Sequence, residues 1–218
     1  MLQTSSKKSC LIVDSTNGRA ILLFMGKGQE TRAAIVDEAL DLVSTVGLTG
    51  LSIGVLATAT GMSKSGLFAH FRSKEQLQLQ VLEEAKNRFE QQIFRPAIKQ
   101  PRGEPRVRAM FDNWMDSWEN DLPGGCVFHA VSAELDDQPG PARDYLISTQ
   151  IGYGKVIRHA AEIAVQEGHF QRDLDLDQFV FEYMSITGAY HHFGRLLGDP
   201  RAEERARKAF EGLLVRSR

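Results

Sequence analysis

Apolar residues recur through most of this chain at intervals of three and four positions, which is the spacing of one face of an α-helix. The first clear case spans 29–46, where the residues on the shared face are Ala34, Ile35, Ala39, Leu42, Val43 and Val46. Gly47 is expected to close this helix, because glycine easily adopts the left-handed conformation of a helix end. No segment shows clear alternation of apolar and polar residues between hairpin turns. The pattern predicts an all-α fold.

Capping residues divide the next part of the chain into short helices. Ser52 is placed to cap a helix that ends near residue 60, because a serine oxygen accepts a hydrogen bond from a free amide of the first turn. Gly61 permits a tight turn, and Ser63 caps the following helix. Leu67 and Phe71 are four positions apart, so we expect both to point back into a helical core.

The rest of the chain also has helical spacing. Ser73 and Gln76 match a capping box, which starts a longer helix that we expect to stop before Pro96. Asp199 followed by Pro200 is expected to open the last helix. Between these points the predicted helices are 104–120, 127–135, 141–166 and 175–197, followed by 199–215.

The second short helix, residues 63–70, carries the kind of side chains that a DNA major groove admits. Ser63, Ser65 and Gly66 are small, so they leave room for close approach to the base edges. Lys64 adds a flexible positive charge that suits a phosphate or a guanine edge. We therefore expect this helix to be the one that enters the groove.

The rim of this helix is positively charged. His70, Arg72 and Lys74 are placed to meet the phosphate backbone, and three formal positive charges with no acidic residue fall between residues 63 and 74. Phe68 lies at the same rim. The candidate DNA-binding residues are Ser52, Ser63, Lys64, Ser65, Gly66, Phe68, His70, Arg72 and Lys74.

Composition limits the partners of the chain. Its 218 residues carry a net charge of −2 with a pI near 6.3, so a basic surface for DNA must be local. Cys10 and Cys126 cannot form a disulfide framework, which predicts a reducing cytoplasm. No apolar run reaches the length of a membrane span, so we expect no membrane partner.

The segment from Leu51 to Leu77 resembles the helix-turn-helix of the TetR family of bacterial transcriptional regulators. That family pattern has an Ile-Ala pair, an Ala-Gly-Val-Ser turn, then Leu-Tyr, His-Phe, Lys and Leu. The corresponding positions here are Leu56-Ala57, Thr60-Gly61-Met62-Ser63, Leu67-Phe68, His70-Phe71, Lys74 and Leu77. Family members usually have tyrosine where this chain has Phe68, so the phosphate contact of that hydroxyl is missing.

The resemblance implies how the chain is divided. Residues 28–87 would form the TetR-type helix-turn-helix domain, and residues 88–218 a larger helical domain for effector binding and dimerisation. We interpret residues 1–27 as a disordered extension or the product of a mis-called start, the alternative being a weakly ordered arm.

The larger domain offers two apolar sets. The first consists mainly of aromatic residues that we expect to line an effector pocket, although ordinary core packing remains an alternative: Phe111, Trp114, Trp118, Phe128, Tyr153 and Ile157. The second lies on the last two helices and is expected to form a dimer interface, with intramolecular core again the alternative: Phe179, Tyr183, Ile186, Tyr190, Phe210 and Leu214.

These observations predict a ligand-responsive DNA-binding regulator. The simplest form is a homodimeric repressor that places residues 63–70 in each half of a palindromic operator and is released by a small molecule. The alternatives are an activator of the same fold and an all-helical dimeric interaction protein that binds no DNA. No nucleophile with a base, phosphate loop or zinc signature occurs in the sequence, so we predict neither an enzyme nor a bound metal or cofactor.

Overall fold

A computed structural model describes the backbone of residues 10–13, 20–23 and 27–218, and the side chains of residues 28–117 and 121–218. The described part is all-α apart from one pair of short strands. An N-terminal helix-turn-helix domain is followed by a larger helical domain, as the resemblance implies. The first domain contains α1 (Lys27–Gly50), α2 (Ile53–Thr60), α3 (Lys64–His70) and α4 (Lys74–Phe89).

The second domain continues from the end of α4. It begins with a π-helical turn, η1 (Glu90–Phe94), and the short α5 (Arg95–Ala97). Three longer elements follow, α6 (Glu104–Asn120), α7 (Val127–Leu135) and α8 (Pro141–Gln166). A helical hairpin closes the chain, made of α9 (Leu176–His191), the π-helical η2 (His192–Leu196) and α10 (Ala202–Ser217).

The two strands are a difference from the sequence prediction. β1 (Cys10–Val13) pairs antiparallel with β2 (Ala20–Leu23). Runs of four apolar residues are too short to show alternation, so the pattern gave no sign of them. The other residues before Lys27 lie outside the described residues. The expectation of an extension or a mis-called start therefore stays a prediction.

The helix that begins at α4 runs past the point where we expected it to stop. It continues through Pro96 to Ala97, and the backbone widens from α to π geometry over Glu90–Phe94. Proline has no amide proton to donate to the carbonyl one turn earlier, and its ring crowds that carbonyl. A π turn just before proline lets the helix continue without this clash.

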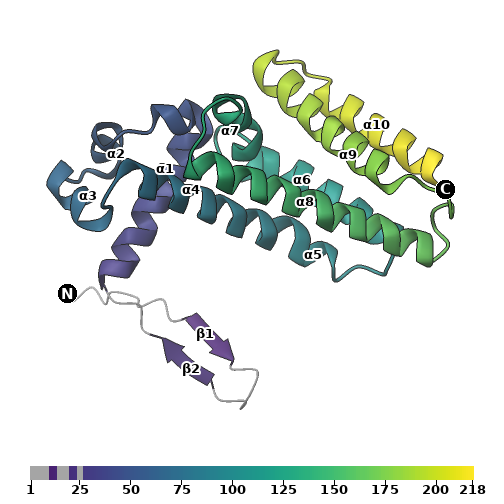
Figure 1. Cartoon of the computed structure of the whole chain (residues 1–218), viewed down its shortest axis with the longest axis horizontal. Coiled ribbons are helices and arrows are strands. Elements are labelled where there is room, and N and C mark those ends of the chain that lie inside the picture. Colours follow the sequence, from purple (N-terminus) through teal and green to yellow (C-terminus); the bar gives the residue numbers. More distant parts are fainter. Residues whose placement is uncertain (1–9, 14–19, 24–26) are drawn as a thin grey trace, which may run out of the picture.

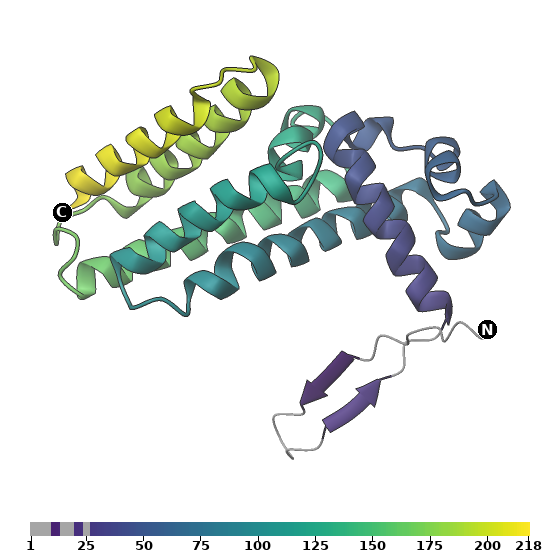
Figure 2. The same cartoon turned by 180° about the vertical axis from the view of Figure 1, so that it is seen from behind.

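The molecule is elongated, with the helix-turn-helix domain and the C-terminal hairpin toward opposite ends (Figures 1 and 2). α2 and α3 lie at one end, and the α9–α10 hairpin lies toward the other. α4 packs on α1 and on α8, so it belongs to both domains. The first domain therefore does not have a core of its own.

Two hydrophobic clusters make up the core. One joins α1–α4 to α7 and the first half of α8, and the other joins α6, the second half of α8 and the C-terminal hairpin. Phe89, Phe94 and Cys126 pack against both clusters. Any change in the space around these three residues therefore alters the packing of both the helix-turn-helix domain and the C-terminal hairpin.

Candidate nucleic-acid interface and effector cavity

The caps predicted for α2 and α3 are confirmed. The Ser52 hydroxyl accepts a hydrogen bond from the Val55 amide at 3.2 Å, and the Ser63 hydroxyl accepts one from the Gly66 amide at 3.1 Å. Gly61 adopts φ 65°, in the left-handed region. These caps fix the angle between the two helices without any long side chain.

The same local chemistry decides which face of α3 is free. Leu67 and Phe71 are fully buried, as predicted, and Arg32 lies 5.3 Å from the centre of the Phe71 ring. The opposite face is exposed, and Phe68 keeps 56% of its surface. The exposed members of the predicted DNA-binding set are Ser52, Ser63, Lys64, Ser65, Phe68, Arg72 and Lys74, while Gly66 and His70 are half-buried.

Lys64 projects along this exposed surface toward the start of α2. A Cβ added to Gly54 would lie 3.8 Å from Lys64 Cε and 3.9 Å from Lys64 Nζ. The ammonium group therefore lies across the N-terminal turn of α2, near the capped Ser52. A helix start and a lysine ammonium thus lie side by side at this point, an arrangement suited to an anionic backbone.

The start of α4 completes this edge. The Gln76 amide donates to the Ser73 hydroxyl at 3.1 Å, which is one half of the predicted capping box. The Gln76 side-chain oxygen accepts from the Arg72 amide at 2.9 Å, one residue before the Ser73 amide that the motif would use. This bond fixes the backbone at Arg72, whose side chain is exposed.

Lys74 differs from the prediction. Its ammonium donates to the Thr49 carbonyl at 3.0 Å, so it ties α4 to the end of α1. The exposed carbonyls at a helix end are strong local acceptors for a lysine, and sequence spacing alone does not reveal them. Lys74 therefore helps to position the helix-turn-helix domain, which we call the head, and Lys64 and Arg72 are the better candidates for phosphate contact.

A link between the two domains was missed by sequence reasoning. The Glu134 carboxylate, on α7, accepts the Thr49 amide at 2.9 Å and the Thr49 hydroxyl at 3.0 Å. Gly47 has φ 75°, and a Cβ there would lie 1.8 Å from Glu134 Oε1. Only glycine fits both the backbone and the carboxylate at this point. We call these contacts the Glu134 clasp.

A second contact lies beside the clasp. The Gly124 amide donates to the Ser44 hydroxyl at 2.9 Å, and a Cβ on Gly124 would lie 1.6 Å from the Ser44 carbonyl oxygen. The loop before α7 is therefore pressed directly onto α1. This contact and the clasp together make α7 the element of the second domain that holds the base of the head.

The predicted effector residues are brought together only in part. Those with described side chains are all buried, and four of them line one cavity of about 40 Å³: Trp114, Phe128, Tyr153 and Ile157. Phe111 lies elsewhere, stacked on Phe210 with 3.9 Å between ring centroids. The Trp118 side chain lies outside the described residues.

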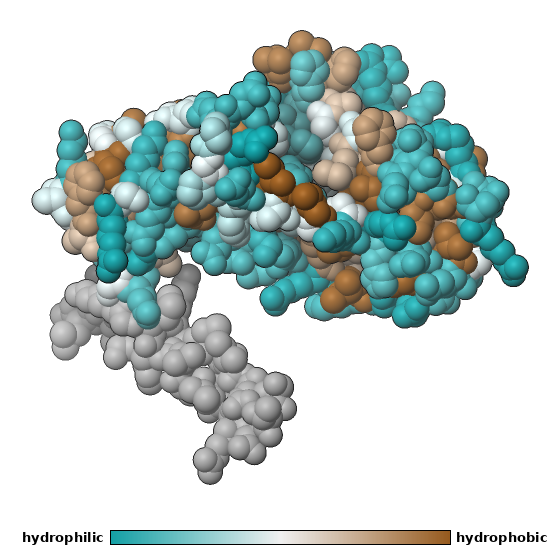
Figure 3. All heavy atoms as spheres, viewed as in Figure 1, coloured by the Kyte–Doolittle hydropathy of each residue, from teal (hydrophilic) through white to brown (hydrophobic). Residues whose placement is uncertain are grey.

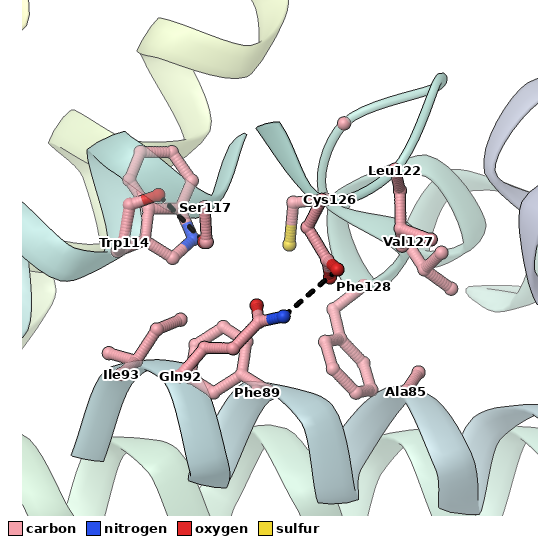
Figure 4. Close-up of a pocket in the computed structure, with 12 residues that line it drawn as sticks. Ala85, Phe89, Gln92, Ile93, Trp114, Ser117, Leu122, Cys126, Val127 and Phe128 are labelled. Carbon is pink, nitrogen blue, oxygen red and sulfur yellow. Dashed lines mark hydrogen bonds between the residues drawn. The ribbon is translucent and has the colours of Figure 1, made fainter. Parts of the chain in front are cut away.

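The cavity also has walls that sequence reasoning missed. Phe89, Phe94 and His129 line it, and they come from α4, η1 and α7. A neighbouring cavity of about 30 Å³ shares Phe89, Trp114 and Cys126 with it. Figure 4 shows this second space, with the Cys126 sulfur pointing toward Gln92 and Phe89. Such walls come from helices far apart in the sequence, which is why local spacing did not identify them.

Burial keeps the titratable walls of the cavity uncharged. Desolvation, and then the nearby His191, lower the pKa of His129 from 6.5 to about 4. Desolvation raises the pKa values of the Cys126 thiol and of the Tyr153 hydroxyl. At neutral pH the cavity therefore has aromatic and neutral polar walls.

The structure corrects most of the predicted dimer interface. Five of the six residues are buried inside the single chain: Phe179, Tyr183, Tyr190, Phe210 and Leu214. An apolar face at helical spacing shows that a helix is covered, but not whether its own chain or a second one covers it. Ile186 keeps part of its surface.

The fold and the head define a helix-turn-helix protein with a helical second domain. Two family models match, one described as bacterial regulatory proteins of the tetR family over residues 35–81, the other as the C-terminal domain of tetracyclin repressor-like proteins over residues 103–210. The chain belongs to the TetR family of bacterial transcriptional regulators.

Individual relatives agree with this assignment. The HTH-type transcriptional regulator AcrR of Shigella flexneri is 37% identical over 57 residues, which cover 26% of each protein. A TetR transcriptional regulator from Chloroflexus aurantiacus has the same fold, with a TM-score of 0.77 and 25% identity over 88% of this chain and 96% of that one. The structure of AibR in complex with isovaleryl coenzyme A and operator DNA aligns with a TM-score of 0.67 and 21% identity, covering 84% of this chain and 95% of that one.

Within the described residues, none of the helices has the length and apolar character needed to cross a membrane.

Proposed function

We propose that this protein is a homodimeric repressor that binds a palindromic operator through α3 and is released by a small-molecule effector. One observation carries the proposal: α3 presents a capped, thin, exposed face next to Lys64 and Arg72, with no acidic residue from 63 to 74. Base-edge contact needs the thin face, and phosphate contact needs the local positive charge. The complex of AibR with operator DNA supports this use of the fold.

The dimer would form through the outer side of the α9–α10 hairpin. An apolar groove of about 410 Å³ lies between these helices, and Ile186, Phe193 and Ala209 are among its walls. Apolar side chains are exposed at the turn of the hairpin, with Leu196 keeping 72% of its surface. Brown atoms gather at this end in Figure 3. A second copy that covers this face would place two recognition helices on one duplex.

Release would follow from the position of the cavity. It lies among the residues that join the two hydrophobic clusters, and α7 carries both Phe128 at the cavity and Glu134 at the clasp. A ligand that moves Phe128 would move α7 and therefore the contact with Thr49. The head would then prefer an angle that does not fit the operator, which is a shift between two states by differential affinity.

The experiment is a salt titration of binding. A fluorescent duplex from the DNA upstream of the gene, and a scrambled duplex of the same length, are titrated with the full chain between about 50 and 200 mM salt. We expect tighter binding to the upstream duplex, footprinted on two symmetric half-sites, and a linear fall of log affinity with log salt. Equal, salt-independent binding to both duplexes would reject the proposal and favour a helical interaction protein in the cytoplasm.

An activator of the same fold would give the same binding. Transcription from the footprinted promoter in a purified system separates the two, because a repressor lowers transcript yield when it is added and an activator raises it. Our proposal requires the lower yield.

A further inference from the structure

Tyr153 lies at the centre of an aromatic cluster where the two hydrophobic clusters meet. Its ring stacks on Phe89 with 4.2 Å between centroids and packs edge-on against Phe94 at 5.5 Å and Phe128 at 5.3 Å. Only 5% of the residue is exposed. Within the described part of the chain, its hydroxyl is buried and has no hydrogen-bond partner.

An unpartnered hydroxyl in such a place is unfavourable. A buried donor without an acceptor destabilises a fold, and a phenylalanine would fill the same space without that penalty. The ring packing therefore does not explain the hydroxyl. A ligand that accepts a hydrogen bond from this hydroxyl would explain it.

Tyr153 also separates the cavity from the surface. An open groove of about 510 Å³ lies between α4–α5 and α8, and both Tyr153 and Phe94 line the groove as well as the cavity. Gly152 lines the groove on the α8 side, and a Cβ added there would meet nothing within 4 Å. A molecule in the groove is thus separated from the cavity by the rings of Phe94 and Tyr153, which line both spaces.

The cavity walls limit the chemistry of that molecule. Their polar groups are neutral ones, with no Lys, Arg, Asp or Glu among the described residues that line the cavity: Cys126, His129, Gln150, Tyr153, Tyr183 and Thr187. A charged ligand would lose its hydration here without gaining a counter-ion. A space of about 40 Å³ holds only a few atoms, so the rings must part for anything as large as benzene.

We propose that the cavity beside Tyr153 binds an uncharged, mainly apolar molecule with one hydrogen-bond acceptor, which accepts a hydrogen bond from the Tyr153 hydroxyl after entering through the groove beside Gly152. The proposal rests on the proposed function only in naming this molecule as the effector. Binding parts the aromatic rings that join the two hydrophobic clusters.

Three probes of similar size test the ligand class by calorimetric titration of the full chain. Acetophenone is neutral with an acceptor, ethylbenzene is neutral without one, and benzoate is charged. We expect acetophenone to bind about 3- to 10-fold more tightly than ethylbenzene, which is the net value of one hydrogen bond. Benzoate should bind roughly 100-fold more weakly than acetophenone or not at all.

Two variants locate the site. Tyr153→Phe should abolish the preference for acetophenone and leave ethylbenzene binding intact. Tyr190→Phe changes a buried tyrosine that lines neither this cavity nor the groove beside Gly152, so the binding of both probes should stay as in the unchanged protein. Gly152→Leu should slow the association of both neutral probes, and Lys155→Leu, on an exposed part of α8 outside the groove, should not.

The outcomes separate this inference from the proposed function. Failure of all three probes to bind, tight benzoate binding, or a preference for acetophenone that persists in Tyr153→Phe would each overturn the ligand class. Operator binding by the same samples is measured in parallel. Intact salt-dependent operator binding with failed probe binding rejects only the ligand inference, whereas absent operator binding rejects the proposed function even if acetophenone binds.

Discussion

The DNA-binding head and the effector cavity are prepared for their partners to different degrees. In the head, the α3 face is already exposed, and α2 and α3 are capped by Ser52 and Ser63. In the cavity, aromatic rings occupy most of the space and leave about 40 Å³. The first partner can dock on a surface that exists, whereas the second must move side chains to enter.

In the proposed mechanism, this difference couples the two sites. A preformed head binds DNA without prior rearrangement, so its affinity is sensitive to any later change in its angle. A closed cavity converts ligand binding into displacement of packed rings, because a close-packed core cannot absorb extra volume. In the proposed mechanism, ligand binding in the second region moves packed side chains and so changes the angle of the head.

Removing one buried leucine should destabilise the preformed head. Leu67→Ala empties a fully buried position under α3 and should destabilise the chain by about 2–5 kcal/mol through lost transfer energy and a cavity. Phe68→Ala, on the exposed face, should change stability by about 0.5 kcal/mol or less. Urea unfolding followed by circular dichroism measures both. Similar losses for the two variants would show that the α3 faces are assigned incorrectly.

Acid should weaken the cavity side selectively. The folded chain holds the His129 pKa at about 4 against 6.5 when unfolded, so between these values the unfolded chain binds a proton that the folded chain does not. Stability contributed at this site is complete above pH 6.5 and falls as pH drops toward 4, by about 3 kcal/mol. His129→Gln should remove this component from the unfolding free energy measured across that range.

The control for this pH effect is an exposed histidine. His159→Gln changes a side chain that keeps 70% of its surface, so the slope of stability against pH should stay as in the unchanged protein. Equal flattening by both substitutions would contradict the buried, neutral character of His129.

Opening the Glu134 clasp should test the connection between the two regions. Glu134→Ala removes two hydrogen bonds to Thr49 and should destabilise the chain by about 1–2 kcal/mol while changing operator affinity. Asp137→Ala removes an exposed acid just beyond the same helix and should do neither. Operator titration of both variants is the measurement. If they behave alike, α7 does not hold the head through this carboxylate.

The smallest expected effect is a gain in stability rather than a loss. Tyr153→Phe removes a buried hydroxyl without a partner, so stability should rise by about 1 kcal/mol. Tyr145→Phe removes the hydroxyl of a partly exposed tyrosine, where water can hydrogen-bond to it, and should leave stability unchanged or lower it. Thermal unfolding of both variants measures this difference in stability. A loss of stability in Tyr153→Phe would mean that the hydroxyl is satisfied in the folded protein.

The head was the more predictable region because its structure is decided locally. Ser52, Gly61 and Ser63 act on amides or torsions within three residues of themselves, and the buried pair Leu67 and Phe71 follows from helical spacing. Lys74 is the exception. Its partner, the Thr49 carbonyl, lies on another helix, so no local rule indicates it.

The second domain was less predictable because its contacts join distant segments. Helical spacing correctly identified Phe210 and Tyr183 as apolar-face residues but not that their own chain covers them. The cavity also needed Phe89 and Phe94 from two further elements, and His129 from α7. The Glu134 clasp depends on a positive φ at Gly47, and a sequence shows only that glycine is present there, not that a carboxylate lies against it.

The most direct test of the central claim is the salt dependence of operator binding in the variant Lys64→Ala/Arg72→Ala. The control is Lys99→Ala/Lys155→Ala, which removes two exposed lysines of the second domain. If both head cations contact phosphates, the slope of log affinity against log salt becomes shallower by about 2 and affinity falls, while the control keeps the slope of the unchanged protein. The same slope and affinity in the head variant and the control would contradict the assignment of this edge to DNA.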